Sequence, residues 1–316
     1  MQNKIQFKTL TALAAFALLA GAAQAQSSVT VYGRLNLTVE NQKAGDSAAK
    51  TVLQNNSSRW GLKGSEDIGG GLKAGFQLES GVTADTGGAA ANYWGRQAEV
   101  NLSGSFGTLR LGQMTSEAYY ATADYISNHN HDTGMSADAL YAYVGRNGNK
   151  ISYRLPSMAQ GMSLEFATSL KEGGANNTFD LAWNYAVGGL QLGAGYEKNG
   201  DATQAAFRAF YMAGNLGFGG YVQRDDDAWG VKGGRTNVRL VGMAVAGANE
   251  FHLNIGRAGK VGNVSDSDAL QYTLGFNHNL SKRTKLYAFF TKVDDGKAGV
   301  YGGDFRSVAG GLRHNF

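Results

Sequence analysis

The last ten residues of the chain, Ser307–Phe316, alternate between apolar side chains and polar or small ones. The apolar parity carries Val308, Gly310, Leu312 and Phe316, and His314 alone interrupts it. The opposite parity carries Ser307, Ala309, Gly311, Arg313 and Asn315. This period of two predicts a β-strand with one oily face and one wet face.

The segment Ser28–Glu40 shows the same alternation near the start of the chain. Its apolar face carries Val29, Val31, Gly33, Leu35, Leu37 and Val39. Because a soluble domain seldom ends on an apolar strand with an open edge, we expect Ser28–Glu40 to pair with Ser307–Phe316. That pairing closes the sheet, and the oily outside with the wet inside predicts an all-β fold, a transmembrane antiparallel β-barrel.

Similar segments recur along the chain, and short turns alternate with longer polar loops between them. A barrel of this kind has an even number of strands, each about 9–11 residues long in the hydrocarbon. The sequence predicts sixteen strands, at Ser28–Glu40, Thr51–Ser65, Leu72–Val82, Tyr93–Ser103, Gly107–Met114, Ile151–Leu155, Met162–Leu170, Thr178–Val187, Leu190–Glu197, Thr203–Met212, Phe218–Arg224, Thr236–Ala246, Glu250–Arg257, Ala269–Leu280, Thr284–Asp294 and Ser307–Phe316.

The alternation stops between residues 115 and 145. A gap of this length inside an otherwise regular barrel is usually functional.

The first residues have the pattern of a secretory signal peptide. Lys4 and Lys8 give a positive start, Thr11–Ala20 is a short apolar run, and Ala23-Gln24-Ala25 has small residues at the cleavage positions. We expect cleavage after residue 25, which leaves residues 26–316 as a single barrel domain. The apolar run is too short for a membrane-spanning helix, and no other stretch approaches 18 apolar residues.

The composition agrees with a sheet protein exported from the cytoplasm. The chain has 46 glycines but one proline, which suits a sheet whose backbone N–H groups must nearly all donate. It has no cysteine, which excludes a disulfide scaffold and cysteine chemistry. The 29 basic residues barely exceed the 25 acidic ones, and two of the lysines lie in the leader, so there is no footprint for nucleic acid.

Catalytic and metal-binding patterns are weak, and we predict no enzyme activity, no cofactor and no metal site. His129 and His131 lack a third ligand at a fixed spacing. A lipase would need a Ser–His pair on the lipid face, and no serine adjoins His278 or His314 on that face. An adhesin or receptor barrel would have larger loops and no row of lumen arginines.

Several long segments carry a family resemblance. They are Ser27–Gly33, Ser58–Glu79 with the run SRWGLKGSEDIGGGLKAGFQLE, Leu102–Gly112, Asn279–Thr284 and Gly311–Phe316. In these segments the chain resembles the general porins of Gram-negative outer membranes, and it looks most like their small, arginine-rich, anion-preferring branch.

The resemblance implies a homotrimer in the outer membrane, in contact with its lipid and lipopolysaccharide. It implies that the third extracellular loop, residues 115–145, folds inward as a constriction. It also implies that the barrel assembly machinery reads the terminal Phe316 during biogenesis.

The resemblance further implies a charged constriction. Arg59, Arg96 and Arg146 match wall arginines of the anion-preferring branch, and Glu79 matches an acidic wall residue beside them. Acids of the long loop are candidates for the opposing charge: Glu117, Asp124, Asp132 and Asp138.

Arg96 conflicts with an unbroken strand at Tyr93–Ser103. It would share parity with Val100 and Leu102 and face lipid, where a charge costs about 2–4 kcal/mol at the midplane. We therefore predict a bulge or an irregular start near Gly95, or a position near the rim.

The sequence thus predicts a water-filled channel for passive diffusion of small hydrophilic solutes, with a preference for anions. Guanidinium groups stay charged at physiological pH and attract phosphate or carboxylate groups. The alternative is a substrate-selective channel for organic acids or other small anions. A row of lumen aromatics would favour that alternative, and candidates surround the long loop: Tyr119, Tyr120, Tyr125, Tyr141 and Tyr143.

Overall fold

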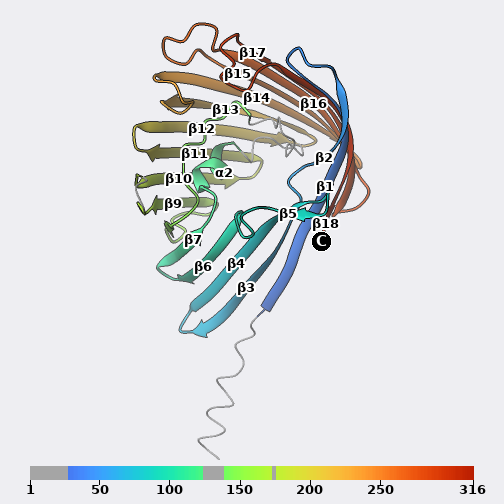
Figure 1. Ribbon diagram of the computed structural model, residues 1–316. Coiled ribbons are helices and arrows are strands. Elements are labelled where there is room, and N and C mark those ends of the chain that lie inside the picture. Colours follow the sequence, from blue (N-terminus) through green and yellow to red (C-terminus); the bar gives the residue numbers. More distant parts are fainter. Residues whose placement is uncertain (1–27, 124–138, 173–175) are drawn as a thin grey trace, which may run out of the picture.

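The computed structural model describes residues 28–123, 139–172 and 176–316, which form strands and one short helix (Figure 1). The helix is α2 (Glu117–Thr122), and it is too short to cross a membrane. The strands are β1 (Ser28–Ala44), β2 (Lys50–Asn55), β3 (Arg59–Gly69), β4 (Leu72–Thr83), β5 (Gly88–Ala89), β6 (Gln97–Gly104), β7 (Gly107–Gln113), β8 (Lys150–Arg154), β9 (Met162–Ser169), β10 (Thr178–Val187), β11 (Leu190–Asn199), β12 (Ala202–Ala213), β13 (Leu216–Asp226), β14 (Gly234–Ala246), β15 (Asn249–Ala258), β16 (Ala269–Asn279), β17 (Thr284–Asp295) and β18 (Phe305–Asn315).

The first and last strands pair, as the sequence predicts. β1 runs antiparallel to β18 from Arg34 opposite Asn315 to Ala44 opposite Phe305. Beyond the end of β18, Phe316 exchanges two backbone hydrogen bonds with Gly33, of 3.0 and 3.1 Å. Each remaining strand of the wall pairs antiparallel with its neighbours, so the sheet closes on itself.

The described elements make a sixteen-stranded barrel wall. β2 and β3 both pair with β1, one above the other, so they form a single wall strand broken at residues 56–58. Ser57 at the break has φ +54°. β5 pairs only with the end of β4 and is not one of the strands of the barrel wall. The sequence correctly predicts the wall but misses this break, which lies inside the expected strand Thr51–Ser65.

Two further boundaries differ from the prediction. The expected strand Tyr93–Ser103 begins only at Gln97, because Gly95 bonds back to Asn92 in a turn. The expected turn at Glu66–Gly70 comes later, since β3 continues with a bulge to Gly69. The chain then reverses through Gly69–Gly71, three residues with φ between +63° and +85°, a conformation that favours glycine.

Alternate residues of each strand face opposite sides of the wall. On β1 the apolar parity is exposed outward, whereas Asn36, Thr38 and Glu40 are buried inside. The inner side chains bond to one another: Thr38 donates to Glu40, and Asn56 donates to Thr38 and to the hydroxyl of Tyr287. The interior is therefore a polar network, and the exposed apolar surface faces outward as in a membrane barrel.

The two ends of the barrel differ. Short turns such as Gly104–Gly107 lie at the end where the chain finishes, and the long connections lie at the other end. By the rule for such barrels, the short turns are periplasmic and the long loops are extracellular. One apolar cluster, where the long loop meets the inner wall, consists of Ala123, Tyr141, Ala206, Phe210, Tyr221 and Val241.

Candidate functional site

Arg59 and Arg96 share the carboxylate of Glu79 on the inner wall. Arg59 begins β3 and lies 3.6 Å from a Glu79 oxygen, and the Nε of Arg96 lies 2.6 Å from the same oxygen. Glu79 is on the inward parity of β4, directly across from Gly61. The structure therefore brings together three of the predicted site residues.

A third guanidinium joins this group from β1. Arg34 is the cross-strand partner of Arg59, and both donate from Nε to the carbonyl of Ser57, at 3.1 and 3.2 Å. Ser57 itself has a left-handed backbone conformation, with φ +54°. We call Arg34, Arg59, Arg96 and Glu79 the arginine cluster, with formal charges of three cations and one anion. Sequence reasoning missed Arg34, although its parity on β1 places it inside.

Arg96 reaches the cluster because it precedes β6 and does not belong to it. The turn at Asn92–Gly95 carries the chain inward, and regular pairing starts at Gln97, opposite Glu79. The predicted irregularity near Gly95 is confirmed, and the charge avoids the lipid. The Arg96 side chain is 33% exposed, so it remains open to solvent.

Arg146 does not join the arginine cluster. It lies in the returning part of the long loop, and its guanidinium donates to the carbonyl of Leu170 at the end of β9. Ser169 in turn donates to the Arg146 carbonyl at 2.8 Å. These contacts fix Arg146 beside the end of β9.

The outgoing part of the long loop lies on the inner wall. Ser116 caps α2 by accepting from the N–H of Ala118, and the helix rests on inward-facing Gly193 and Gly195 of β11. A Cβ at Gly193 would lie 2.0 Å from the Ala121 carbonyl oxygen. Glycine at this position therefore allows the helix to contact the wall directly.

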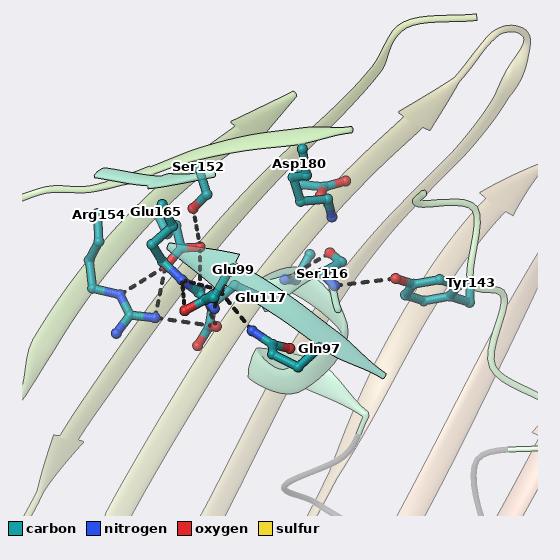
Figure 2. Close-up of polar contacts among 12 residues, drawn as sticks. Gln97, Glu99, Ser116, Glu117, Tyr143, Ser152, Arg154, Glu165 and Asp180 are labelled. Atoms are coloured by element: carbon teal, nitrogen blue, oxygen red, sulfur yellow. Dashed lines mark hydrogen bonds and ion pairs between the residues drawn. The ribbon is translucent and has the colours of Figure 1, made fainter. Parts of the chain in front are cut away.

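Glu117 is the described loop acid that meets arginines, and Figure 2 shows its surroundings. One Glu117 oxygen lies 3.3 Å from Arg154 and 3.9 Å from Arg110. Burial, and next the Glu165 carboxylate, raise the pKa of Glu117 above its ordinary value, against the lowering effect of the two arginines. Glu117 thus faces a different pair of arginines from the three that the sequence singles out.

The residues around Glu117 form a second charged group that sequence reasoning missed. Arg110 bonds Glu99 at 2.7 Å and Glu165 at 3.2 Å. Figure 2 shows Arg154 beside Glu165, which it bonds at 2.7 Å. With Glu117 this acidic cluster holds three carboxylates and two guanidiniums. The signal available in the sequence is parity: these residues alternate inward on β6, β7, β8 and β9.

The returning part of the long loop is also bonded to the inner wall. Gln223 both accepts from and donates to the backbone of Ala142 at 2.8 Å, and Arg235 and Asn237 donate to the Leu140 carbonyl. Both described parts of the loop therefore lie inside the barrel.

The loop tyrosines pack against one another. Tyr119 contacts Tyr120, Tyr141 and Tyr143 with ring centroids 5.5–5.9 Å apart, and its ring meets those of Tyr141 and Tyr143 edge to face. Tyr141 is 5% exposed and hydrogen-bonds to Thr122 at 2.6 Å. Burial raises the pKa of Tyr141 well above its ordinary value. These rings anchor the loop.

Several candidates fall outside the described residues: Asp124, Asp132, Asp138, Tyr125, His129 and His131. Of the lipid-face histidines, His278 bonds Asn249 and His314 bonds Thr284, each at 2.8 Å. Phe316 is exposed on the outer face, where its ring covers Gly33.

Comparison with known proteins agrees with the architecture. The sequence profile of the Gram-negative porin family matches residues 9–298. The chain is 33% identical to the outer membrane porin protein 32 of Delftia acidovorans, over 98% of this chain and 99% of that protein. It is 29% identical to an outer membrane porin protein of Bordetella pertussis, over 98% of this chain and 100% of that protein.

A solved structure has the same fold. The anion-selective porin from Comamonas acidovorans superposes with a TM-score of 0.78 at 27% identity, covering 92% of this chain and 100% of that one. A closed antiparallel barrel with a charged inner wall, matched from end to end by porin sequences, leads to one assignment. The chain belongs to the Gram-negative porins, outer-membrane β-barrels that form channels for passive diffusion of small hydrophilic solutes.

Proposed function

We propose that this porin prefers anions, and that the arginine cluster creates the preference. The observation that carries the proposal is the shared carboxylate: Arg59 and Arg96 both pair with Glu79, and Arg34 lies beside them. Among the described residues this group has three guanidiniums and one carboxylate, so its formal charge is positive.

The charge is permanent and meets the solvent of the lumen. Guanidinium does not lose its proton at physiological pH. Charges lining a narrow passage with low-dielectric walls act strongly on passing ions. The acidic cluster opposes this effect only weakly, because Arg110 and Arg154 pair with two of its three carboxylates, Glu99 and Glu165.

The similarity to a solved porin described as anion-selective supports the same proposal. The arginine cluster provides the physical reason in this chain.

A substrate-selective channel is less well supported. A path for a bound solute along aromatic faces requires exposed, aligned rings, whereas Tyr119 meets Tyr141 and Tyr143 edge to face and Tyr141 is buried. The described part of the chain therefore favours general diffusion.

Three further proposals follow from membership of the family. Residues 1–25 act as a cleaved signal peptide, the barrels assemble as a homotrimer, and the assembly machinery recognises Phe316. The exposed ring of Phe316 on the outer face is compatible with such recognition. The channel carries out no catalysis.

The reversal potential across a planar bilayer under a KCl gradient tests the anion preference. We expect wild type to favour chloride. One unit charge 4–8 Å from a passing ion changes its energy in water by roughly 0.5–1 kcal/mol. The change is unfavourable for chloride and equally favourable for potassium, so Arg59→Ala and Arg96→Ala should each lower the chloride-to-potassium permeability ratio roughly five- to thirtyfold.

Two control variants separate the charge at position 59 from the shape of the side chain and from the net charge of the protein. Arg59→Lys keeps the charge and should retain most of the preference. Arg224→Ala removes one cation from an outward position beside Asp226 and should change nothing. A cation preference in wild type, or equal effects of Arg59→Ala and Arg224→Ala, would remove the arginine cluster from the mechanism.

A further inference from the structure

One guanidinium at the extracellular end of the wall bonds three separate elements. Arg235, the second residue of β14, donates from Nε to Asp225 on β13 at 2.8 Å. Its Nη1 donates to the hydroxyl of Tyr301, in the connection after β17, at 2.8 Å. Its Nη2 donates to the carbonyl of Leu140, in the returning part of the long loop, at 2.7 Å. Each nitrogen of this side chain therefore holds a different part of the molecule.

The Arg235 side chain is enclosed. Its exposed fraction is 0%, as is that of Asp225, which balances its charge. The rings of Trp229 and Tyr301 cover the guanidinium, with centroids 4.4 and 5.2 Å from its central carbon, and the two rings meet edge to face. A planar guanidinium can stack on aromatic rings and direct several hydrogen bonds at once. Because the charge is buried and paired, Arg235 acts by holding its neighbours and not by attracting ions.

The two aromatic rings belong to a set of extracellular connections that contact one another. We call residues 227–233, 259–268 and 296–304 the outer-loop unit. The N–H of Gly296 donates to the carbonyl of Asp268 at 2.9 Å, which joins the third connection to the second. A Cβ at Gly233 would lie 2.5 Å from the Cα of Gly262, so the first and second connections are in backbone contact. The ring pair over Arg235 joins the first connection to the third.

The long loop meets the outer-loop unit at a buried residue. Leu140 is 0% exposed and belongs to a small apolar cluster. The cluster consists of Leu140, Ala258, Ala269 and Tyr301. The Leu140 carbonyl accepts from Arg235 and from Asn237, and a buried carbonyl without such donors would cost free energy. Arg235 therefore connects the returning part of the long loop to the outer-loop unit.

We propose that Arg235 is the positioning residue through which the outer-loop unit fixes the returning part of the long loop. A change in the outer-loop unit, on the cell surface, therefore alters the order of a segment that lies inside the barrel. The proposal is independent of the anion preference, which depends on the charge of the arginine cluster.

The test combines amide hydrogen exchange at residues 139–145 of the folded barrel in detergent with open-channel current noise in a planar bilayer. The double variant Arg235→Met with Asp225→Asn removes both charges at similar volume, a replacement that is often neutral for stability. Its urea concentration at half unfolding should equal that of wild type. Exchange at residues 139–145 should rise roughly ten- to hundredfold, because a hydrogen bond from a charged donor is lost, and the noise should rise with it.

Two single variants separate the contacts of Arg235. Arg235→Lys can still pair with Asp225, but its one nitrogen cannot also bond Leu140 and Tyr301. It should therefore loosen residues 139–145 as the double variant does. Trp229→Ala changes only the outer-loop unit, and it should raise the same exchange roughly fivefold or more.

Lys232→Ala and Arg257→Met are matched controls. Lys232 is an exposed residue of the same connection as Trp229, and Arg257 is an exposed cation on β15. Both controls should leave exchange and noise unchanged. Four results would overturn the proposal: no rise in the double variant, no rise with Trp229→Ala, an equal rise in the controls, or a rise at residues 139–145 that the wall strands share. The last result would limit Arg235 to a role in the stability of the barrel.

Discussion

At the scale of single residues, Glu79 both positions and partly neutralises the arginine cluster. Its carboxylate is shared by two arginines that arrive from opposite sides, one at the start of β3 and one before β6. It thus holds Arg59 and Arg96 in place and also reduces their field. A substitution that keeps the shape of the Glu79 side chain but removes its charge separates these two effects.

We predict that Glu79→Gln raises the chloride preference. The amide keeps hydrogen-bonding capacity but removes the negative charge, so the permeability ratio for chloride over potassium should rise roughly five- to thirtyfold. Glu66→Gln, an exposed acid near the periplasmic turn, should have no effect on the reversal potential. A fall in chloride preference on Glu79→Gln would show that Glu79 acts mainly by positioning the arginines.

The sequence identifies part of this site and misses the rest for a physical reason. Parity places Arg59 and Glu79 inside, and the cost of a charge in lipid predicts the irregular start that turns Arg96 inward. Parity does not tell which inward residues share a height on the wall, because that depends on the register between strands. Parity alone therefore does not identify Arg110 and Arg154 as the partners of Glu117.

At the scale of elements, α2 is held on the wall by a glycine platform and by the acidic cluster. Ala118 and Ala121 lie against Gly195 and Gly193, which fixes the distance between the helix and β11. Glu117 then sits among Arg110, Arg154, Glu99 and Glu165, where its ionised form is disfavoured. Docking of the helix is therefore linked to protonation of Glu117.

We predict that α2 is held more firmly as the pH falls. Docking raises the pKa of Glu117 above its ordinary value of about 4.3. The contribution of protonated Glu117 to the stability of the docked helix is therefore fully present below that ordinary value, and it is lost as the pH rises through the raised pKa. Open-channel current noise should therefore decrease when a bilayer recording is taken from pH 7 toward pH 4.

Glu117→Gln mimics the protonated acid and should show low noise at every pH. Glu172→Gln, an exposed loop acid, should keep the wild-type dependence. Noise that grows on acidification in wild type would contradict the assignment of Glu117.

The sequence also predicts the elements unevenly. Strand existence follows from period-two alternation, which is strong where one face meets lipid. The break between β2 and β3 is not evident from the alternation, because residues 56–58 are only three polar residues and the apolar pattern resumes directly after them. Its signal is the interior bonding of Asn56 and Ser58 to Asn36, which depends on tertiary contacts.

At the scale of the whole molecule, closure depends on the seam between β1 and β18. Gly33 lies between β3 and the C-terminal residue. A Cβ at Gly33 would lie 2.5 Å from the Arg59 carbonyl oxygen and 2.5 Å from the ring of Phe316. The ring occupies the space that a side chain would take. The pairing itself is predicted from the two terminal patterns and is confirmed.

We predict that Gly33→Val destabilises the closed barrel. The added side chain collides with backbone, and overpacking of this kind costs about 1–3 kcal/mol. The urea concentration at which half of the barrel is unfolded should fall accordingly, as measured by the shift in gel mobility between the folded and the heat-denatured protein. Gly310→Val lies on the same seam with nothing within 4 Å of its Cβ, so it should be neutral. Equal midpoints for the two variants would contradict the role given to Gly33.

Neighbours in the chain such as Arg34 and Leu35 touch different solvents, one the aqueous passage and the other the bilayer. Selection for a new permeant ion therefore acts on every second codon, while selection for insertion acts on the codons between. A lineage can exchange the ionic character of its pore by single substitutions and still present an unaltered shell to the lipid.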